Sequence, residues 1–414
     1  MAEIVWSPDP EAIEASNLAR FMKGIPGSPQ TYDDLWRWSI DDRAAFWQAV
    51  WDFTGVIASK PPERPVGEEA MPGTEWFPGA RLNFAENLLR GDPDAVAIVA
   101  VTEEGGIETV DRTGLRRRVA AAQHGLMRLG VAEGDRVAAL ITNGIEAVVG
   151  MLATAAIGAI WSSCSPDFGP LGVIDRFGQI EPKVLIAVDG YVYNGESYRV
   201  HTTVADALDS IASIEHVVVI DRIGDPIESE KALAWSDLLA EGPAEPDYAQ
   251  LPFDHPLLIM YSSGTTGRPK SIVHGAGGTL LKHLSEHVLH CDLKPGDRLF
   301  WFTTCGWMMW NWLVSGLAAG AAIVLYDGSP SHPSLERLWR MAEQSGITHF
   351  GTSPKYLAAN ANAGLVPREI ADLSSIRWVG STGAPLLPEQ FDWFYENLPT
   401  NIQLASVSGG TDII

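Results

Sequence analysis

The stretch Tyr261-Ser-Ser-Gly-Thr-Thr-Gly-Arg-Pro-Lys270 follows a short apolar run, Pro256-Leu-Leu-Ile-Met260, and leads into Ser271-Ile-Val-His274. The apolar run is typical of a buried strand. Because Pro269 disfavours a helix at Lys270, the sequence predicts a strand, a loop and a returning strand. Glycines let a backbone approach a ligand closely, and hydroxyls, backbone N–H groups and a lysine together bind anions. The loop therefore predicts a polyphosphate site, with an ordinary surface turn as the alternative.

The loop is not a Walker A sequence, which needs four residues between its first glycine and a Gly-Lys-Ser/Thr ending. Gly264 and Gly267 stand too close together for that pattern. The ten-residue string resembles instead the phosphate loop of the adenylate-forming enzymes, which include acyl-CoA synthetases, luciferases and peptide-synthetase adenylation domains. The resemblance implies that this string holds the β- and γ-phosphates of ATP. The implied nucleotide-binding residues are Ser262, Ser263, Gly264, Thr265, Thr266, Gly267 and Lys270, of which Thr266 and Lys270 are also implied to be catalytic.

A second motif that resembles this family lies near the end of the chain, in Leu404-Ala-Ser-Val-Ser-Gly-Gly-Thr-Asp412. It is similar to the family's Tyr-Gly-x-Thr-Glu motif, which implies that Thr411 contacts the α-phosphate and that Asp412 binds Mg²⁺, both as catalytic residues. A carboxylate oxygen suits this hard cation. Ser408 stands where an aromatic ring usually stacks on adenine. The implied nucleotide-binding residues of this region are Gly383, Ala384 and Pro385, which meet the adenine, together with Ser408, Gly409, Gly410 and Thr411.

A Trp-rich segment, Thr303-Thr-Cys-Gly-Trp-Met-Met-Trp-Asn-Trp312, is similar in position to the Gly-Trp pair that lines the acyl pocket of short-chain acyl-CoA synthetases. Gly409 stands where acetyl-specific members carry a Trp that closes this pocket. A hydrogen in place of an indole leaves room for a longer acyl chain. The two segments together look most like the acetoacetate-specific branch of the family. The implied substrate pocket consists of Trp307, Met308, Thr382 and Gly409.

The polar segment Asp189–Tyr198 follows a predicted strand over 184–188, at the end of a strand where ligands of open α/β sheets bind. In related synthetases the corresponding loop contributes to the CoA nucleotide site, which implies a role for Asn194 and Gly195. Glu196 stands where acetyl-specific relatives tend to have a basic residue. An ordinary surface loop is the alternative.

Apolar strands and amphipathic helices alternate from residue 95 onward, which predicts an α/β protein with parallel sheets covered by helices. The resemblance implies a large synthetase domain with stacked, mostly parallel sheets and a smaller β subdomain. We expect a helical lead-in over 1–75, including a helix over 39–53, a first α/β lobe over 76–245, and a second lobe over 246–414 that contains the phosphate loop and the nucleotide motif. Further helices are expected over 112–129, 144–158, 278–290 and 334–345, and strands over 95–101, 134–141, 216–220, 297–302, 318–325 and 348–352.

The formal net charge of −23 argues against binding to negatively charged partners, namely nucleic acid and anionic membrane surfaces. Three widely spaced cysteines, Cys164, Cys291 and Cys305, predict buried free thiols in a reducing compartment. The first residues lack a signal-peptide pattern, and the longest apolar stretches fall short of the ~20 residues that a bilayer span needs. These features predict a soluble cytoplasmic protein, and the sequence does not predict its oligomeric state.

Three histidines, His283, His287 and His290, follow one another at spacings of four and three residues in the helix expected over 278–290. This spacing places them near one face, where a metal site is one interpretation. No fourth ligand type stands nearby in the sequence, so the other interpretation is that these histidines are solvated or cap a helix.

The family resemblance implies an ATP-dependent acid–thiol ligase that uses Mg²⁺, forms acetoacetyl-AMP from acetoacetate and transfers the acyl group to CoA. A related enzyme acting on acetate, propionate or butyrate is an alternative, because one methylene changes binding by only ~1–3 kcal/mol. In the family, the Thr-Asp motif is followed by an Asp for the ribose, a hinge and a C-terminal lid with a catalytic lysine, and none of these is in this sequence. A third hypothesis is therefore a non-catalytic nucleotide-binding or interaction protein.

Overall fold

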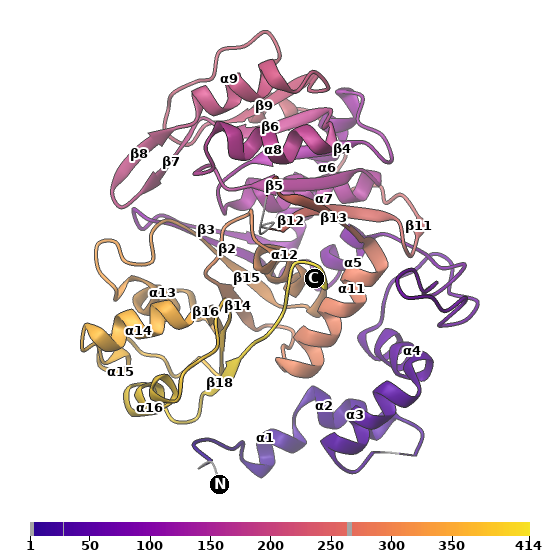
Figure 1. Ribbon diagram of the computed structural model, residues 1–414, viewed down its shortest axis with the longest axis vertical. Helices are drawn as coiled ribbons and strands as arrows, with labels where there is room; N and C mark the ends of the chain where they lie inside the picture. The colour runs from indigo at the N-terminus through magenta and orange to yellow at the C-terminus, as the bar shows by residue number, and fades with distance from the viewer. Residues whose placement is uncertain (1–3, 28, 263–266) are drawn as a thin grey trace.

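The computed structural model describes residues 4–27, 29–262 and 267–414, and two seven-stranded sheets form its core. They lie one above the other in Figure 1, with helices between them and on their outer faces. The upper sheet has the strand order β10-β9-β6-β4-β5-β12-β13, and the lower sheet has the order β18-β17-β16-β14-β15-β2-β3. Each sheet is parallel except for one antiparallel edge pair, β12 with β13 and β2 with β3. The predicted α/β class with mostly parallel sheets is confirmed.

The strands of the upper sheet are β4 Arg136–Leu140, β5 Ile160–Cys164, β6 Val184–Val188, β9 His216–Ile220, β10 Ala232–Ala234, β12 Pro256–Ser262 and β13 Lys270–Gly275. Those of the lower sheet are β2 Val96–Thr102, β3 Ile107–Asp111, β14 Arg298–Trp301, β15 Ala322–Asp327, β16 His349–Thr352, β17 Trp378–Ser381 and β18 Gln403–Ser406. The described residues also form two two-stranded sheets, β1 Arg81–Leu82 with β11 Leu251–Pro252, and β7 Gly190–Tyr193 with β8 Glu196–Arg199. Beside the two large sheets, a separate β subdomain larger than a two-stranded ribbon is not found in these residues.

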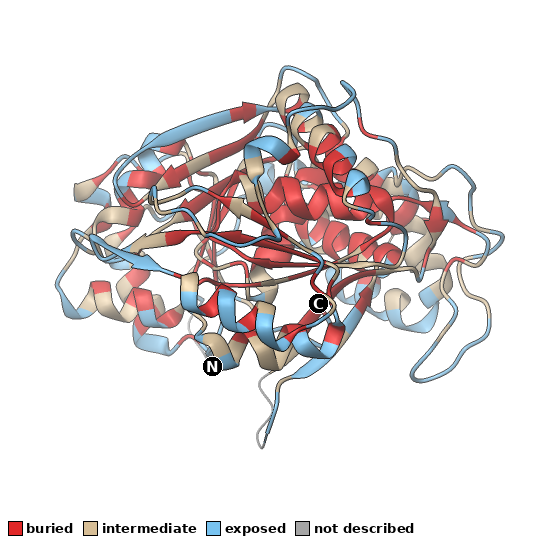
Figure 2. Cartoon of the chain, turned by 90° about the horizontal axis from the view of Figure 1, so that it is seen from above, coloured by how far each residue is buried: buried red, intermediate tan, exposed pale blue. Residues whose placement is uncertain are grey.

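The helices are arranged in layers around the two sheets (Figure 1). Every residue of α7 is buried except Glu146, as expected for a helix between two sheets. Figure 2 shows such fully buried helices at the centre of the molecule. The helices up to α7 are α1 Pro10–Glu14, α2 Asn17–Gly24, α3 Tyr32–Asp41, α4 Arg43–Thr54, α5 Phe84–Leu89, α6 Arg112–Arg128 and α7 Ile145–Ile157. The later ones are α8 Pro170–Ile180, α9 His201–Ser210, α10 Trp235–Leu238, α11 Ala276–Leu284, α12 Met308–Ser315, α13 Arg337–Ser345, α14 Pro354–Asn362, α15 Pro367–Ile370 and α16 Pro388–Asn397.

Several expected elements differ from the observed ones for local reasons. The helix expected over 39–53 is divided, because the Asp42 side chain accepts a hydrogen bond from Ala45 N and caps the start of α4. The helix expected over 278–290 changes after Leu284 into a π-helix, η1, over Ser285–His290. The strand expected over 318–325 begins only at Ala322, because a 3₁₀ turn, η2, occupies Gly316–Ala319.

The two sheets do not follow the expected division of the chain at residue 245. Strands β12 and β13, from the second half, complete the upper sheet, whereas β2 and β3, from the first half, complete the lower one. All three cysteines are buried free thiols, as predicted, and burial raises the pKa of Cys164 to about 12. None of the helices in the described part of the chain is long and apolar enough to cross a bilayer.

Candidate nucleotide- and acyl-binding site

The predicted phosphate loop connects two paired strands, as expected. Strands β12 and β13 are antiparallel, and Ser262 at the end of β12 pairs with Lys270 at the start of β13. Lys270 is exposed, and Gly267 is exposed with a φ of +125°, a conformation that favours glycine. Four predicted site residues lie outside the described residues, namely Ser263, Gly264, Thr265 and Thr266.

This hairpin lies beside the Thr-Asp motif near the end of the chain. The imidazole Nε2 of His274, in β13, donates a hydrogen bond of 2.8 Å to the backbone carbonyl of Thr411. Burial lowers the pKa of His274, although the Thr411 carbonyl and Asp412 oppose this effect. The ring is therefore neutral near pH 7 and keeps its N–H for Thr411. A partly buried hydrogen bond thus joins two motifs that are distant in the sequence.

Helix α8 supports the other side of the hairpin. Gln179 in this helix donates from Nε2 to the carbonyl of Pro269 at 2.9 Å and accepts from Ser271 Oγ at 3.2 Å. Arg268 and Asp175 form an exposed ion pair at 3.2 Å, which contributes little to stability. Roles for His274 and Gln179 are not predictable from the sequence, because nothing in it shows that their partners lie near them in space.

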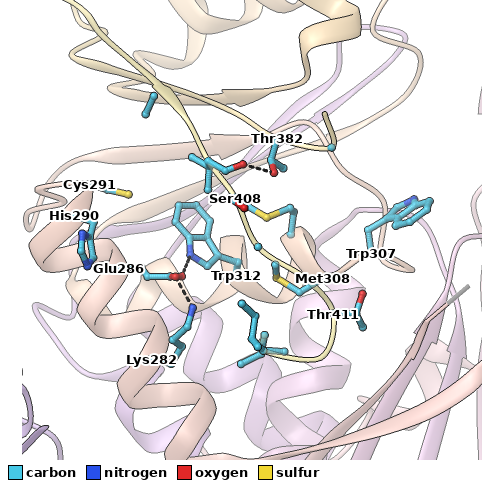
Figure 3. Close-up of a pocket in the computed structure, with 18 of the residues that line it drawn as sticks. Lys282, Glu286, His290, Cys291, Trp307, Met308, Trp312, Thr382, Ser408 and Thr411 are labelled. Carbon is cyan, nitrogen blue, oxygen red and sulfur yellow. Dashed lines mark hydrogen bonds and ion pairs between the residues drawn. The ribbon is translucent and has the colours of Figure 1, made fainter. Parts of the chain in front are cut away.

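A cavity of about 440 Å³ lies next to the Thr-Asp motif (Figure 3). All four residues of the predicted acyl pocket line it, namely Trp307, Met308, Thr382 and Gly409. Five predicted nucleotide-binding residues also line it, because Gly409 belongs to both sets and is joined by Gly383, Ser408, Gly410 and Thr411. The Thr382 hydroxyl donates to the carbonyl of Val407 at 2.7 Å and so joins two of the lining segments. Ala384 and Pro385 are exposed and do not line this cavity.

Asp412 is an exposed carboxylate at the same motif. A Cβ on Gly410 would lie 2.5 Å from Asp412 Oδ1, so a side chain at this position would displace the carboxylate from its present place. The described residues contain no group of three or more His, Cys, Asp or Glu side chains that could hold a metal. Mg²⁺ is commonly held by one or two carboxylates together with substrate phosphates. The residues present therefore fit a cation that arrives with a nucleotide.

Helix α11 and the π-helix η1 present two different faces. His283 and His287 point into the core, where their Nε2 atoms donate to the carbonyls of Ile414 at 2.9 Å and Trp312 at 2.8 Å. Burial lowers the pKa of His287 to about 3, so this ring is neutral at physiological pH. The expectation of solvated histidines is wrong for these two residues, because the sequence spacing does not show which helix face is covered. The opposite face contributes Lys282, Glu286 and His290 to the cavity.

Asn194 and Gly195 form the tip of the β7–β8 hairpin and do not line the 440 Å³ cavity. Their backbone N–H groups donate to the buried carboxylate of Glu103 at 3.1 and 2.6 Å, and Ser329 N–H donates to the same carboxylate at 2.6 Å. These bonds lower the pKa of Glu103, although burial opposes them. Because both hairpin N–H groups are engaged, a ligand at this tip could use only the side chain of Asn194 and the backbone carbonyls.

Two family models match the chain. The model described as AMP-binding enzyme matches residues 85–412, and the one described as acetyl-coenzyme A synthetase N-terminus matches residues 32–88. The chain is 46% identical to the acetoacetyl-coenzyme A synthetase of Rhizobium meliloti, over 99% of this chain and 64% of that protein. It is 42% identical to the malonamoyl-CoA synthetase of Penicillium aethiopicum, over 100% of this chain and 62% of that protein.

A solved structure, that of acetoacetyl-CoA synthetase from Streptomyces lividans, is similar over the whole fold. The TM-score is 0.95 at 45% sequence identity, and the match covers 99% of this chain and 65% of that one. The chain thus spans less than two thirds of the length of each of these relatives. With the paired strands β12 and β13, the Thr-Asp motif beside them and a family-model match over most of its length, the chain belongs to the AMP-binding enzyme family.

Proposed function

We propose that this chain binds ATP and acetoacetate and forms acetoacetyl-AMP, the first step of an acid–thiol ligase reaction that ends in acetoacetyl-CoA. The observation that supports this proposal best is the hydrogen bond from His274 to Thr411, which holds the phosphate hairpin beside the motif and the cavity. The relatives of R. meliloti and S. lividans support acetoacetate as the acid, because both are named for acetoacetyl-CoA.

In the proposed reaction an acetoacetate carboxylate oxygen attacks the α-phosphorus of ATP, the bond to the β-phosphate oxygen breaks, and pyrophosphate leaves. Ser262, Gly267 and Lys270, with the loop between them, hold the β- and γ-phosphates, and Thr411 contacts the α-phosphate. Asp412 would hold Mg²⁺, which would supply neutralisation of the charge that develops during this displacement. The cavity walls orient the acid for in-line attack. The thiol of CoA then displaces AMP from the acyl carbon, with the CoA nucleotide near Asn194 and Gly195.

A second candidate substrate is malonamate, because a 42% identical relative is a malonamoyl-CoA synthetase. Acetoacetate and malonamate have the same chain length, and both have a carbonyl group at C3. They differ only in the group beyond it, a methyl or an amide nitrogen. We therefore define the proposed substrate class as short acids with a C3 carbonyl, here called 3-oxo acids.

The proposal is tested by titrating the chain with Mg·ATP and by measuring pyrophosphate release with acetoacetate, malonamate, butyrate, propionate and acetate. We expect ATP binding and acid-dependent release that is fastest with acetoacetate. Faster release with malonamate or with an alkyl acid would reassign the substrate. Binding of ATP without release with any acid would contradict the ligase and support a nucleotide-binding protein, and absence of ATP binding would contradict both.

A further inference from the structure

The cavity has one charged wall that the proposed reaction chemistry does not use. Lys282, Glu286 and His290 follow one another every four residues along α11 and η1, and all three line the cavity. Figure 3 shows Lys282 and Glu286 on the α11 side of the space, with Trp307 and Thr411 on the opposite side. Apart from this wall, the lining includes many apolar side chains, among them Met308, Met309 and Trp312. A charged pair inside such a cavity indicates a polar ligand group.

Lys282 is held in place by a chain of two interactions. Its ammonium group forms an ion pair with Glu286, and the other carboxylate oxygen of Glu286 accepts a hydrogen bond of 2.8 Å from Trp312 Nε1. The π-helical turn of η1 contributes to this arrangement, because Cys291 N–H bonds to the carbonyl of Glu286, five residues back. In the part of the chain that the structure describes, Glu286 is the one hydrogen-bond partner of the Lys282 ammonium group. Two N–H donors of Lys282 therefore remain for a ligand.

The lining at Gly409 leaves room for a ligand inside the cavity. An ideal Cβ on Gly409 would meet only one atom within 4 Å, the Cε of Met308 at 3.8 Å. The space beside Gly409 is thus open toward the interior of the cavity. An acyl chain that passes Gly409 would place its far end near the charged wall.

We infer that Lys282 donates a hydrogen bond to the C3 carbonyl oxygen of the bound acid and so selects 3-oxo acids over alkyl acids of the same length. This inference rests on the proposed function. A butyryl chain would place a methyl or methylene group against the ammonium donors and leave them unpaired. Because the Lys282 side chain is 30% exposed, water weakens the penalty, and we expect a preference of at least ~10-fold.

The experiment uses two non-hydrolysable acyl-AMP mimics, the N-acetoacetyl and N-butyryl sulfamoyl adenosines, and measures their affinities by isothermal titration. The wild-type chain should bind the acetoacetyl mimic at least ~10-fold more tightly than the butyryl mimic. Lys282→Met keeps the length of the side chain but removes its donors, so the two affinities should become about equal. Lys282→Arg should retain a preference, and Lys355→Met, at an exposed lysine of α14, should leave the ratio unchanged.

The ratio of two affinities for the same variant is insensitive to a fraction of misfolded protein. If the wild-type chain binds both mimics equally, or if Lys282→Met keeps the wild-type ratio, the inference about Lys282 is wrong while the proposed function stands. If the wild-type chain binds neither mimic, the proposed function itself is contradicted and the inference falls with it.

Discussion

Asp412 is an exposed carboxylate, and the described residues contain no group of three or more His, Cys, Asp or Glu side chains that could hold a metal. Mg²⁺ should raise the affinity of the wild-type chain for ATP if Asp412 holds this cation. In Asp412→Ala this increase in affinity should be at least ~10-fold smaller. The affinity for metal-free ATP should stay the same or rise slightly, since a negative charge is lost. Titrations with and without Mg²⁺ measure both quantities. Asp392→Ala, at an exposed carboxylate of α16, is the control, and an unchanged Mg²⁺ effect in Asp412→Ala would remove this residue from the metal site.

Gly409 determines how far the cavity extends. Its φ lies outside the left-handed region, and a Cβ would meet only Met308 Cε within 4 Å, so the backbone at Gly409 accepts a residue with a side chain, such as Trp. The indole should fill the cavity and weaken binding of the acetoacetyl mimic by at least ~10-fold, with a smaller effect on the acetyl mimic. Titration of both mimics checks this expectation, together with a thermal melt to confirm folding. Equal losses for the two mimics would show that this space does not set the acyl length.

The β12–β13 hairpin offers a matched pair of histidines. His274 Nε2 donates to Thr411 O at 2.8 Å, and His255 Nε2, just before β12, donates to Gly158 O at the same distance. Replacing either by Leu leaves a carbonyl without its donor, and we expect each variant to lose ~1–2 kcal/mol of stability. Only His274→Leu should also weaken ATP binding, because it alone separates the hairpin from the Thr-Asp motif. Urea unfolding and ATP titration on both variants measure the two effects, and equal ATP affinities would mean that the bond has no role in the site.

Among the elements, those with strong local signals were predicted well. The strands at 184–188 and 216–220 agree with β6 and β9, and the strand–loop–strand prediction at 256–274 is confirmed. The faces of α11 and η1 were not predictable, because the π-helical turn rotates His290 away from His283 and His287. The four-residue spacing of Lys282, Glu286 and His290 is a signal in the sequence that places these three side chains on one helix face.

Buried neutral histidines should make the stability of the whole molecule depend on pH. Burial lowers the pKa of His287 to about 3 and that of His349 to about 4. In the unfolded chain both rings take up a proton near pH 6.5. The contribution of the two neutral rings to the free energy of unfolding is therefore fully present above that pH and is lost as the pH falls toward the folded pKa values. At pH 5 each ring should therefore lower the free energy of unfolding by about 2 kcal/mol, relative to its value at neutral pH.

The measurement is urea unfolding at pH 7.5 and pH 5. The urea concentration at the wild-type unfolding midpoint should be lower at pH 5 than at pH 7.5. His287→Gln should make this decrease smaller, since glutamine cannot take up the proton. His124→Gln, at an exposed histidine of α6, should leave the fall unchanged. A fall of the same size in His287→Gln would contradict the role assigned to His287.

For the molecule as a whole, the α/β class and the two motifs were predictable, because each depends on a continuous run of residues. The division of the chain into lobes was not predictable from the sequence. Strand β2 pairs with β15, and β5 pairs with β12, so each pairing joins segments far apart in the sequence. For the same reason, the contacts of His274 with Thr411 and of Gln179 with Pro269 could not be foreseen.

The exchange of strands between the two halves has a consequence for synthesis on the ribosome. Strand β2 is made early, yet its parallel partner β15 is made about 220 residues later. At ~5–20 residues per second, β2 and its mostly buried apolar side chains wait for tens of seconds without that partner. We therefore expect the nascent chain to depend on chaperones during this interval.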